Sequence, residues 1–229
     1  MPSYLACEGF HKRRGSVKKI SESAVRRLSL YLRLLKVVAG KQELISSQEL
    51  AERSGVTSAQ VRKDLSLFGS FGQRGRGYEV HELIETLQGI LGLGRRWRVA
   101  IVGVGRLGSA LLGYRELSQR GFDIVAAFDV DASKVGARLR GLEVSGIDSL
   151  ERVIREREVK IGIITTPPEA APDIADRLAT AGVSAILNFA PVKIGGDEGT
   201  VVRTMDLALE LEGLTFALTS SHGAERSHA

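Results

Sequence analysis

The chain has 229 residues, a net charge of +5, 43% hydrophobic residues and 26% charged residues, which is the composition of a globular protein. No apolar run approaches the roughly 18 residues that cross a bilayer, and the N-terminus lacks the apolar core of a secretory signal, so we expect a cytoplasmic protein with no membrane partner. A single cysteine, Cys7, excludes an internal disulfide framework.

The charge is divided unevenly along the chain. Residues 1–97 hold 17 Lys and Arg against 9 Asp and Glu, a net of +8, whereas residues 98–229 hold 15 against 18, a net of −3. Such asymmetry predicts two domains, one of which faces a polyanion. A solvated basic face would explain the charge excess equally well. Residues 1–20 are expected to form a basic, flexible tail.

Residues 21–80 have the pattern of a winged helix-turn-helix domain. In the segment before Gly40, apolar residues recur three and four positions apart, which predicts an amphipathic helix. These residues are Val25, Leu28, Leu32, Leu35 and Val38. Two short helices follow, each opened by a capping box, Ser46 with Glu49 and Thr57 with Gln60. The tight turn between these two helices makes the helix-turn-helix.

The second short helix is expected to read DNA, because the second helix of such a motif enters the major groove. Its candidate contact residues are Ser58, Gln60, Arg62 and Lys63. The glycine-rich segment that follows predicts a hairpin wing with Arg74 and Arg76 near its tip, suited to phosphates or a narrow minor groove. The alternative is a small helical domain for protein contacts. Residues 81–97 are expected to form a linker helix.

Residues 98–203 alternate strands and helices, which predicts a Rossmann-type parallel sheet. A glycine turn follows the first strand and opens a helix, where the backbone can approach a pyrophosphate. The turn comprises Gly103, Val104, Gly105, Arg106, Leu107 and Gly108. Asp129 ends the next strand, and its carboxylate can accept both ribose hydroxyls while repelling a 2′-phosphate. This arrangement favours NAD(H) over NADP(H), with Asp131 as the alternative ribose ligand.

The later strand ends supply candidate walls for the nicotinamide half, because ligands bind beyond the carboxyl ends of strands in open α/β sheets. These candidates are Thr165, Thr166, Pro167, Asn188, Phe189, Ala190 and Pro191. A purely structural turn is the alternative for each of them. No histidine lies at a strand end of the nucleotide domain, and no lysine is a persuasive catalytic acid, although Lys193 is the least unsuitable candidate. We therefore expect no catalytic residue, no metal site and no enzyme.

The last apolar segment comes after the Rossmann unit is complete. Leu207, Leu211, Leu214 and Leu218 share one helical face, so residues 204–220 predict a helix whose apolar stripe needs a partner. We expect a homodimer, because proteins that read the two half-sites of an inverted-repeat operator are two-fold symmetric. Packing of the helix on its own domain is the alternative. Residues 221–229 are expected to form a flexible tail.

Five segments within residues 20–218 carry a family resemblance. They are TSAQVRKDLSLFGSFGQRGRGY, AIVGVGRLGSALLGY, RGFDIVAAFDVDASKVG, ILNFAPV and VVRTMDLALELEGLTFAL. Together they resemble the Rex family of redox-sensing transcriptional repressors. The resemblance implies a homodimer with a domain-swapped C-terminal helix, which senses the NADH/NAD+ ratio and leaves its operator DNA when NADH binds. It also implies that Tyr114 and Asp206 belong to a redox switch.

A physical basis for this sensing follows from the charge of the nicotinamide ring, which is positive in NAD+ and neutral in NADH. A wall formed by Phe189, Ala190 and Pro191 would penalise burial of the charged ring. Two other classes of function remain open. A small NAD-dependent oxidoreductase with an accessory domain is disfavoured by the missing proton donor. A regulator that binds CoA or another nucleotide is disfavoured by Asp129.

Overall fold

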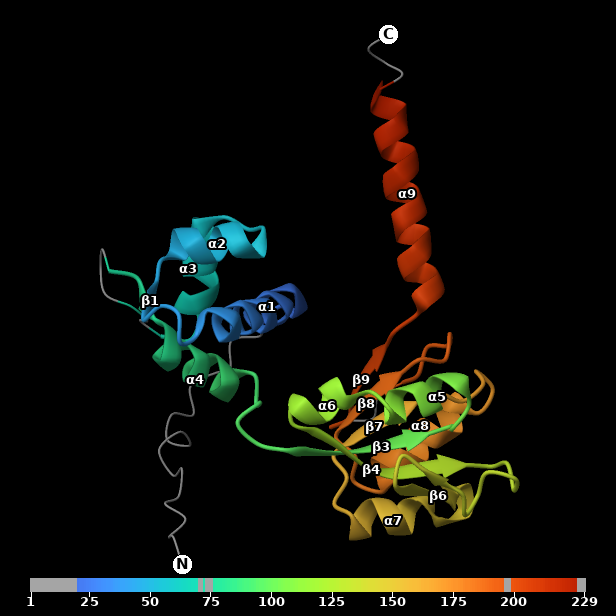
Figure 1. The fold of residues 1–229 in the computed structure, drawn as a ribbon. Helices are drawn as coiled ribbons and strands as arrows, with labels where there is room; N and C mark the ends of the chain where they lie inside the picture. Colours follow the sequence, from blue (N-terminus) through green and yellow to red (C-terminus); the bar gives the residue numbers. More distant parts are fainter. Residues whose placement is uncertain (1–19, 70–71, 73–75, 196–198, 226–229) are drawn as a thin grey trace, which may run out of the picture. The chain divides into compact units, whose positions relative to one another are not determined.

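The computed structural model describes residues 20–69, 72, 76–195 and 199–225. The chain divides into two compact units, Met1–Gly94 and Arg95–Ala229. Figure 1 shows a first unit made mainly of helices and a second unit built on a sheet. Residues 1–19 of the expected basic tail lie outside the described residues, and so does Arg74 of the expected wing.

The first unit contains the predicted helix-turn-helix. Its helices are α1 (Glu22–Val38), α2 (Ser47–Ser54), α3 (Ser58–Ser66) and α4 (Val80–Ile90). The Ser46 hydroxyl accepts the Glu49 N–H at 3.0 Å, and the Thr57 hydroxyl accepts the Gln60 N–H at 3.1 Å, so both predicted N-caps are present. After the expected wing, β2 (Tyr78–Glu79) pairs antiparallel with β1 (Leu44–Ile45), which precedes α2.

The core of the first unit corrects two expectations. Val25 is 37% exposed, because the buried stripe of α1 runs through Ala24 and Tyr31 and leaves Val25 at its edge. Helix α4 was expected to be a linker, but its buried residues Leu83 and Leu87 belong to the same apolar cluster as α1, α2 and α3. This helix is therefore part of the first unit, which the chain leaves after Gly94.

A buried polar cluster joins α3 to α1. The Asp64 carboxylate is 1% exposed and accepts two hydrogen bonds from the Arg27 guanidinium, at 2.6 and 2.8 Å. The Tyr31 hydroxyl donates to it at 2.9 Å, and the Gln60 amide donates at 2.8 Å. Burial alone would raise the pKa of Asp64, but these donors outweigh burial and hold that pKa below its usual value. An ionised Asp64 therefore fixes α3 against α1.

The second unit is a seven-stranded sheet in the order β5-β6-β4-β3-β7-β8-β9. The strands are β3 (Trp97–Val102), β4 (Phe122–Asp129), β5 (Arg138–Leu139), β6 (Leu142–Gly146), β7 (Ile161–Ile164), β8 (Ala185–Asn188) and β9 (Val201–Thr204). All neighbours pair in parallel except β5, which is antiparallel to β6. Without β5, this is the strand order of a Rossmann sheet. The predicted fold class, a winged helix with a Rossmann-type sheet, is confirmed.

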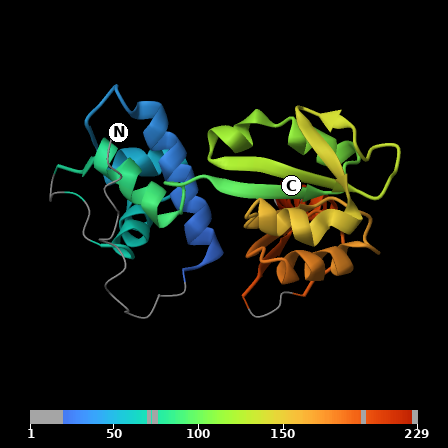
Figure 2. The same ribbon diagram turned by 90° about the horizontal axis from the view of Figure 1, so that it is seen from below.

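Helices cover both faces of this sheet, as Figures 1 and 2 show. They are α5 (Arg106–Leu112), α6 (Arg115–Gln119), α7 (Leu150–Glu156) and α8 (Ala171–Thr180), with a 3-10 turn over Ile147–Ser149 before α7. In β3, Ala100 and Val102 pack in the cluster that contains α7 and α8, whereas Val99 and Ile101 pack with the end of α5. Burial on both faces explains why residues 99–102 of β3 form a continuous apolar run.

Three elements of this unit differ from expectation. The helix expected after the glycine turn is broken into α5 and α6 at Gly113 and Tyr114, where a glycine and an extended residue interrupt the helical backbone. Residues 201–204 form β9, which extends the sheet as its edge strand. Helix α9 runs from Leu207 to Glu225, so part of the expected flexible tail is helical.

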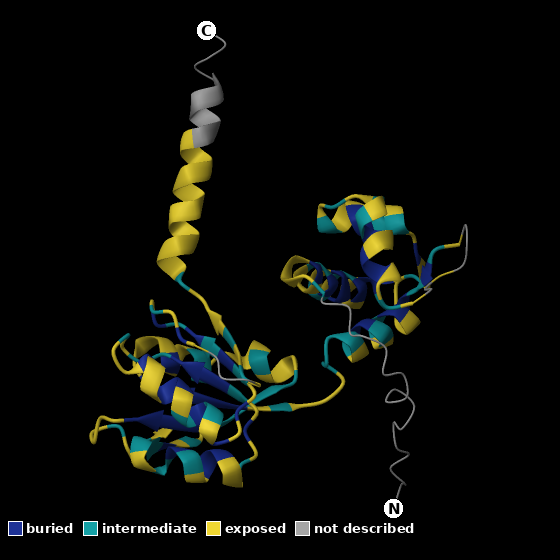
Figure 3. Cartoon of the chain, turned by 180° about the vertical axis from the view of Figure 1, so that it is seen from behind, coloured by how far each residue is buried: buried dark blue, intermediate teal, exposed yellow. Residues whose placement is uncertain are grey.

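Helix α9 exposes its apolar side chains in this chain. Leu207, Leu211, Leu214 and Leu218 are 60–63% exposed. Leu209 and Phe216 lie outside this predicted stripe and are also exposed, so the helix is apolar on more than one face. Figure 3 shows the described residues of α9 as exposed. Among the described residues, no helix is long and apolar enough to span a membrane. Monomeric soluble proteins rarely expose a contiguous apolar surface of this kind.

The Asp64 cluster predicts a pH-dependent stability. Asp64→Asn should lower the free energy of unfolding of the first unit at pH 7 by about 2–4 kcal/mol, because it leaves Arg27 without its buried charged partner. The folded pKa of Asp64 is depressed, so its stabilisation is present above the unfolded pKa of about 3.9 and is lost as the pH falls through the folded value.

Urea denaturation of wild type and Asp64→Asn between pH 3 and pH 7 measures this effect. The difference between the two proteins should shrink below about pH 4. The control Glu22→Gln removes an exposed carboxylate that pairs with Arg26 and should change stability by less than about 1 kcal/mol. A difference for Asp64→Asn that is constant over this pH range would contradict the ionised cluster.

Candidate nucleotide site and nucleic-acid interface

The glycine turn after β3 crosses the end of β7 at very close range. Gly103 has φ +93°, and a Cβ there would lie 2.8 Å from the carbonyl oxygen of Thr165. A Cβ at Gly108 would lie 2.0 Å from the carbonyl oxygen of Gly103. Both positions therefore require glycine. A Cβ at Gly105 would meet nothing within 4 Å, so the backbone on this side is open to a ligand.

Two threonines at the end of β7 complete the crossing. The Thr165 hydroxyl donates to the carbonyl oxygen of Gly103 at 2.6 Å. The Thr165 N–H donates to the carbonyl oxygen of Val102 at 2.9 Å. These bonds hold the turn in one conformation. The Thr166 hydroxyl oxygen is buried and has no hydrogen-bond partner among the described residues. A buried polar atom of this kind beside a cavity is available to a ligand.

Asp129 connects the end of β4 to the glycine turn. Its carboxylate is 7% exposed and accepts the N–H of Val104 at 2.7 Å and the N–H of Asp131 at 2.9 Å. The Lys134 ammonium lies 3.1 Å from the same carboxylate. Burial alone would raise the pKa of Asp129, but the two N–H groups and Lys134 outweigh burial and hold that pKa below its usual value. Asp129 is therefore an ionised acceptor at the edge of the sheet.

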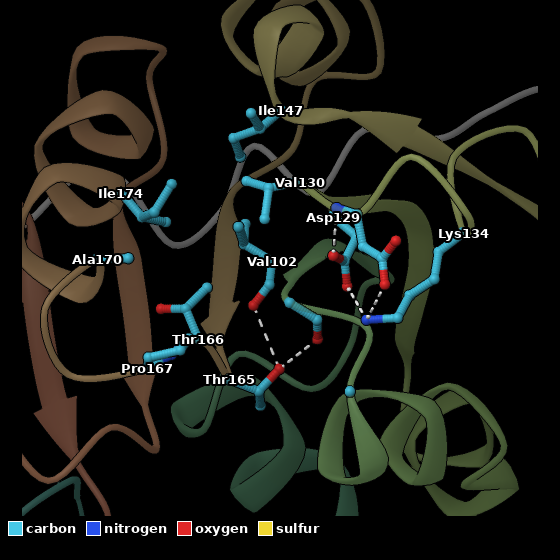
Figure 4. Close-up of a pocket in the computed structure, with 13 residues that line it drawn as sticks. Val102, Asp129, Val130, Lys134, Ile147, Thr165, Thr166, Pro167, Ala170 and Ile174 are labelled. Carbon is cyan, nitrogen blue, oxygen red and sulfur yellow. Dashed lines mark hydrogen bonds and ion pairs between the residues drawn. The ribbon is translucent and has the colours of Figure 1, made fainter.

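A cavity of about 500 Å³ lies between these groups, at the carboxyl ends of β3, β4 and β7 (Figure 4). Its predicted lining residues are Gly103, Gly105, Asp129, Thr165, Thr166 and Pro167, and Asp131 also lines it. Residues that the sequence reasoning missed are Val102, Val130, Lys134, Ile147, Ala170 and Ile174. The strand order reverses between β3 and β7, which is where a Rossmann sheet binds its ligand. Apolar walls with a few polar groups suit a nucleotide.

The remaining predicted site residues do not line this cavity. Val104, Arg106, Leu107 and Gly108 belong to the glycine turn and α5 beside it. Asn188 is fully buried, and its side chain bonds the N–H and the carbonyl of Ala190, so it stabilises the turn after β8. Phe189 packs against the cluster of Val99 and Ile101. A wall of Phe189, Ala190 and Pro191 for the nicotinamide stays a prediction.

The two residues of the implied redox switch have separate local partners. The Tyr114 side chain is half-exposed, and its hydroxyl donates to the Glu116 carboxylate at 2.9 Å. The Asp206 carboxylate accepts the N–H groups of Ala208 at 2.9 Å and Leu209 at 3.3 Å, so it caps the start of α9. A joint role for Tyr114 and Asp206 stays a prediction.

The candidate DNA-contacting residues divide by exposure. Arg62 and Lys63 are exposed on α3, and Arg76 is exposed just before β2. Ser58 and Gln60 are half-buried, and the Gln60 amide already donates to Asp64. The two exposed cations of α3 are therefore better placed to meet a polyanion than Gln60. In the described part of the chain, no group of three or more His, Cys, Asp or Glu residues could hold a metal ion.

Two family models match the chain. The model described as CoA binding domain covers residues 95–192, and the model described as putative DNA-binding protein N-terminus covers residues 19–66. The first match falls within the unit that carries the cavity. The second match falls within the helical unit and includes α2 and α3.

Curated relatives cover nearly the whole chain. The redox-sensing transcriptional repressor Rex of Desulforamulus reducens is 49% identical over 201 residues, which are 87% of this chain and 96% of the relative. The Rex repressor of Carboxydothermus hydrogenoformans is 49% identical over 199 residues, 86% of this chain and 96% of the relative. Both matches span the helical unit and the sheet unit together.

Solved structures agree with these relatives. The Rex-family repressor RSP in complex with beta-NAD+ and operator DNA has a TM-score of 0.85 and 35% identity, covering 90% of this chain and 96% of that one. RSP in complex with beta-NADH has a TM-score of 0.81 and 32% identity, covering 91% and 98%. The sequence identity, the coverage and the fold lead to one assignment. The chain belongs to the Rex family of redox-sensing transcriptional repressors.

Proposed function

We propose that this protein is a cytoplasmic, homodimeric repressor that binds operator DNA and senses the NADH/NAD+ ratio, with lower affinity for DNA when NADH is bound. The observation that carries this proposal is the combination, in one chain, of exposed cations on α3 with a nucleotide cavity at the switch point of the sheet. It is supported by RSP, a relative with the same fold that has been crystallised with beta-NADH and with beta-NAD+ and operator DNA.

The residues of the cavity fit a dinucleotide. The open backbone at Gly105 accommodates the diphosphate, and the ionised Asp129 accepts the hydroxyls of the adenosine ribose. Val130, Ile147 and Ile174 give the apolar wall that a purine requires. The nicotinamide supplies the redox signal, because its ring is positive in NAD+ and neutral in NADH. Burial against Phe189 would disfavour the positive form.

Dimer formation is assigned to α9. Its apolar side chains are exposed in the single chain, and burial against a second copy would remove them from water. We propose that each α9 packs on the partner subunit as a swapped helix. Asp206 at its first turn would then meet the partner's nucleotide domain, where Tyr114 could complete the redox switch. Two-fold symmetry fits an inverted-repeat operator.

A regulatory role is favoured over catalysis. No histidine is among the described residues that line the cavity, and the relatives are named as repressors. A CoA-binding regulator is the second candidate, because the matched family model of residues 95–192 is described as a CoA binding domain. The ribose of CoA carries a phosphate, which the net negative charge of Asp129, Asp131 and Lys134 would disfavour.

The proposal predicts different effects of the two nucleotides on DNA binding. At fixed salt, NADH should weaken binding to an inverted-repeat operator at least about tenfold more than NAD+ does, because a ligand shifts an equilibrium only by its differential affinity for the two states. Fluorescence anisotropy of labelled operator measures both effects. Equal effects of NADH and NAD+ would contradict redox sensing.

Gly108→Ala should abolish NADH binding, because its Cβ would collide with the backbone of Gly103 and displace the turn. The helical unit is a separate compact unit and should retain its fold and its DNA affinity without nucleotide. The matched control is Gly89→Ala, whose Cβ meets nothing within 4 Å. Calorimetric titration with NADH distinguishes the variants. Unchanged NADH affinity in Gly108→Ala would place the nucleotide elsewhere.

The double variant Leu211→Glu with Leu214→Glu should be monomeric, because charges cannot be buried in an apolar interface without partners. Its operator affinity should fall at least about tenfold, since one subunit then reads only one half-site. Analytical ultracentrifugation gives the oligomeric state, and NADH titration shows whether the nucleotide domain is intact. A dimeric double variant would exclude α9 as the interface.

A further inference from the structure

We infer that Lys134 is a specificity-determining residue of the nucleotide site, where it offsets the acidic pair Asp129 and Asp131 and so limits rejection of a 2′-phosphate on the adenosine ribose. The inference rests on the proposed function and refines it. Asp129 alone would make the site select strictly for NADH and NAD+. With Lys134 beside it, we expect weak but measurable binding of NADPH as well.

The position of Lys134 is fixed by a structured turn after β4. The carbonyl of Asp131 accepts the N–H groups of Lys134 at 2.9 Å and Val135 at 3.1 Å, and the Asp131 carboxylate accepts the N–H of Ser133 at 2.9 Å. The Lys134 side chain extends from this turn toward Asp129 (Figure 4). Its ammonium lies 3.1 Å from the Asp129 carboxylate and 3.6 Å from that of Asp131.

The hydrogen bonds of Asp129 bring the ammonium close to the ribose. One carboxylate oxygen of Asp129 accepts both the Val104 N–H and the Lys134 ammonium, and the other accepts the Asp131 N–H. A ribose bound to Asp129 therefore shares this carboxylate with Lys134. A group attached to a ribose oxygen would lie within a few ångströms of the ammonium, well inside the Debye length of about 8 Å at physiological salt.

The charge balance of the cavity determines the sign of the effect. Among the described lining residues, the charged side chains are Asp129, Asp131 and Lys134, which sum to −1. Without Lys134 the sum becomes −2, and repulsion of a 2′-phosphate increases. The Lys134 side chain is 35% exposed, so solvent weakens this effect. The neutral ribose of NADH has no phosphate at this point and should be far less affected.

The test compares NADH and NADPH binding by wild type and Lys134→Met at fixed ionic strength, using the fluorescence of the nucleotide. The ratio of Kd for NADPH to Kd for NADH should rise about tenfold in Lys134→Met. Lys134→Arg should return the ratio close to the wild-type value. The matched control is Lys160→Met, because Lys160 is exposed and precedes β7 at the opposite end of that strand from Thr165. Its ratio should not change.

The outcomes separate this inference from the proposed function. An unchanged ratio in Lys134→Met overturns the inference, even if both affinities fall together. Wild type that binds NADH but shows no NADPH binding up to millimolar concentration also overturns it. Wild type that binds neither nucleotide overturns the proposed function and this inference with it. The inference is supported if the ratio of Kd for NADPH to Kd for NADH rises in Lys134→Met and stays close to the wild-type value in Lys134→Arg and Lys160→Met.

Discussion

The close crossing of the glycine turn over the end of β7 is the constraint on which the nucleotide site depends. A Cβ at Gly103 would collide with the backbone of Thr165, and a Cβ at Gly108 would collide with the carbonyl oxygen of Gly103. The Thr165 hydroxyl then holds the turn by bonding the Gly103 carbonyl. This crossing directs the Val104 N–H at Asp129 and leaves Gly105 open beside the cavity. The site is therefore organised by the protein itself, which is what a receptor for a dinucleotide requires.

Two further interactions organise the parts of the chain that we propose to contact DNA and to form the dimer. In the helical unit, the ionised Asp64 fixes α3, so that Arg62 and Lys63 are presented from a rigid helix. After the sheet unit, Asp206 caps an apolar helix that exposes its leucines and Phe216. A second copy of the chain is the partner that we propose for this helix. In such a dimer, a nucleotide could alter the spacing of two recognition helices without touching either of them.

Local rules were sufficient for much of the fold and for part of the site. The glycine spacing, the position of Asp129 at a strand end and the caps Ser46 and Thr57 all depend on residues close in sequence or on strand order. Lys134 was missed because its role depends on a turn that folds back on β4. The inward direction of Gln60 was missed because its partner, Asp64, is buried only when α1 packs on α3.

The central claim is that nucleotide binding and operator binding are coupled in one protein. Binding of NADH should change the affinity for the operator more than binding of NAD+ does. Thermodynamic linkage makes this coupling reciprocal. The most direct measurement is therefore the affinity for each nucleotide with and without saturating operator DNA. We predict that operator DNA weakens NADH binding by the same factor by which NADH weakens operator binding, and that it affects NAD+ binding much less. Identical NADH affinities with and without operator would contradict the account.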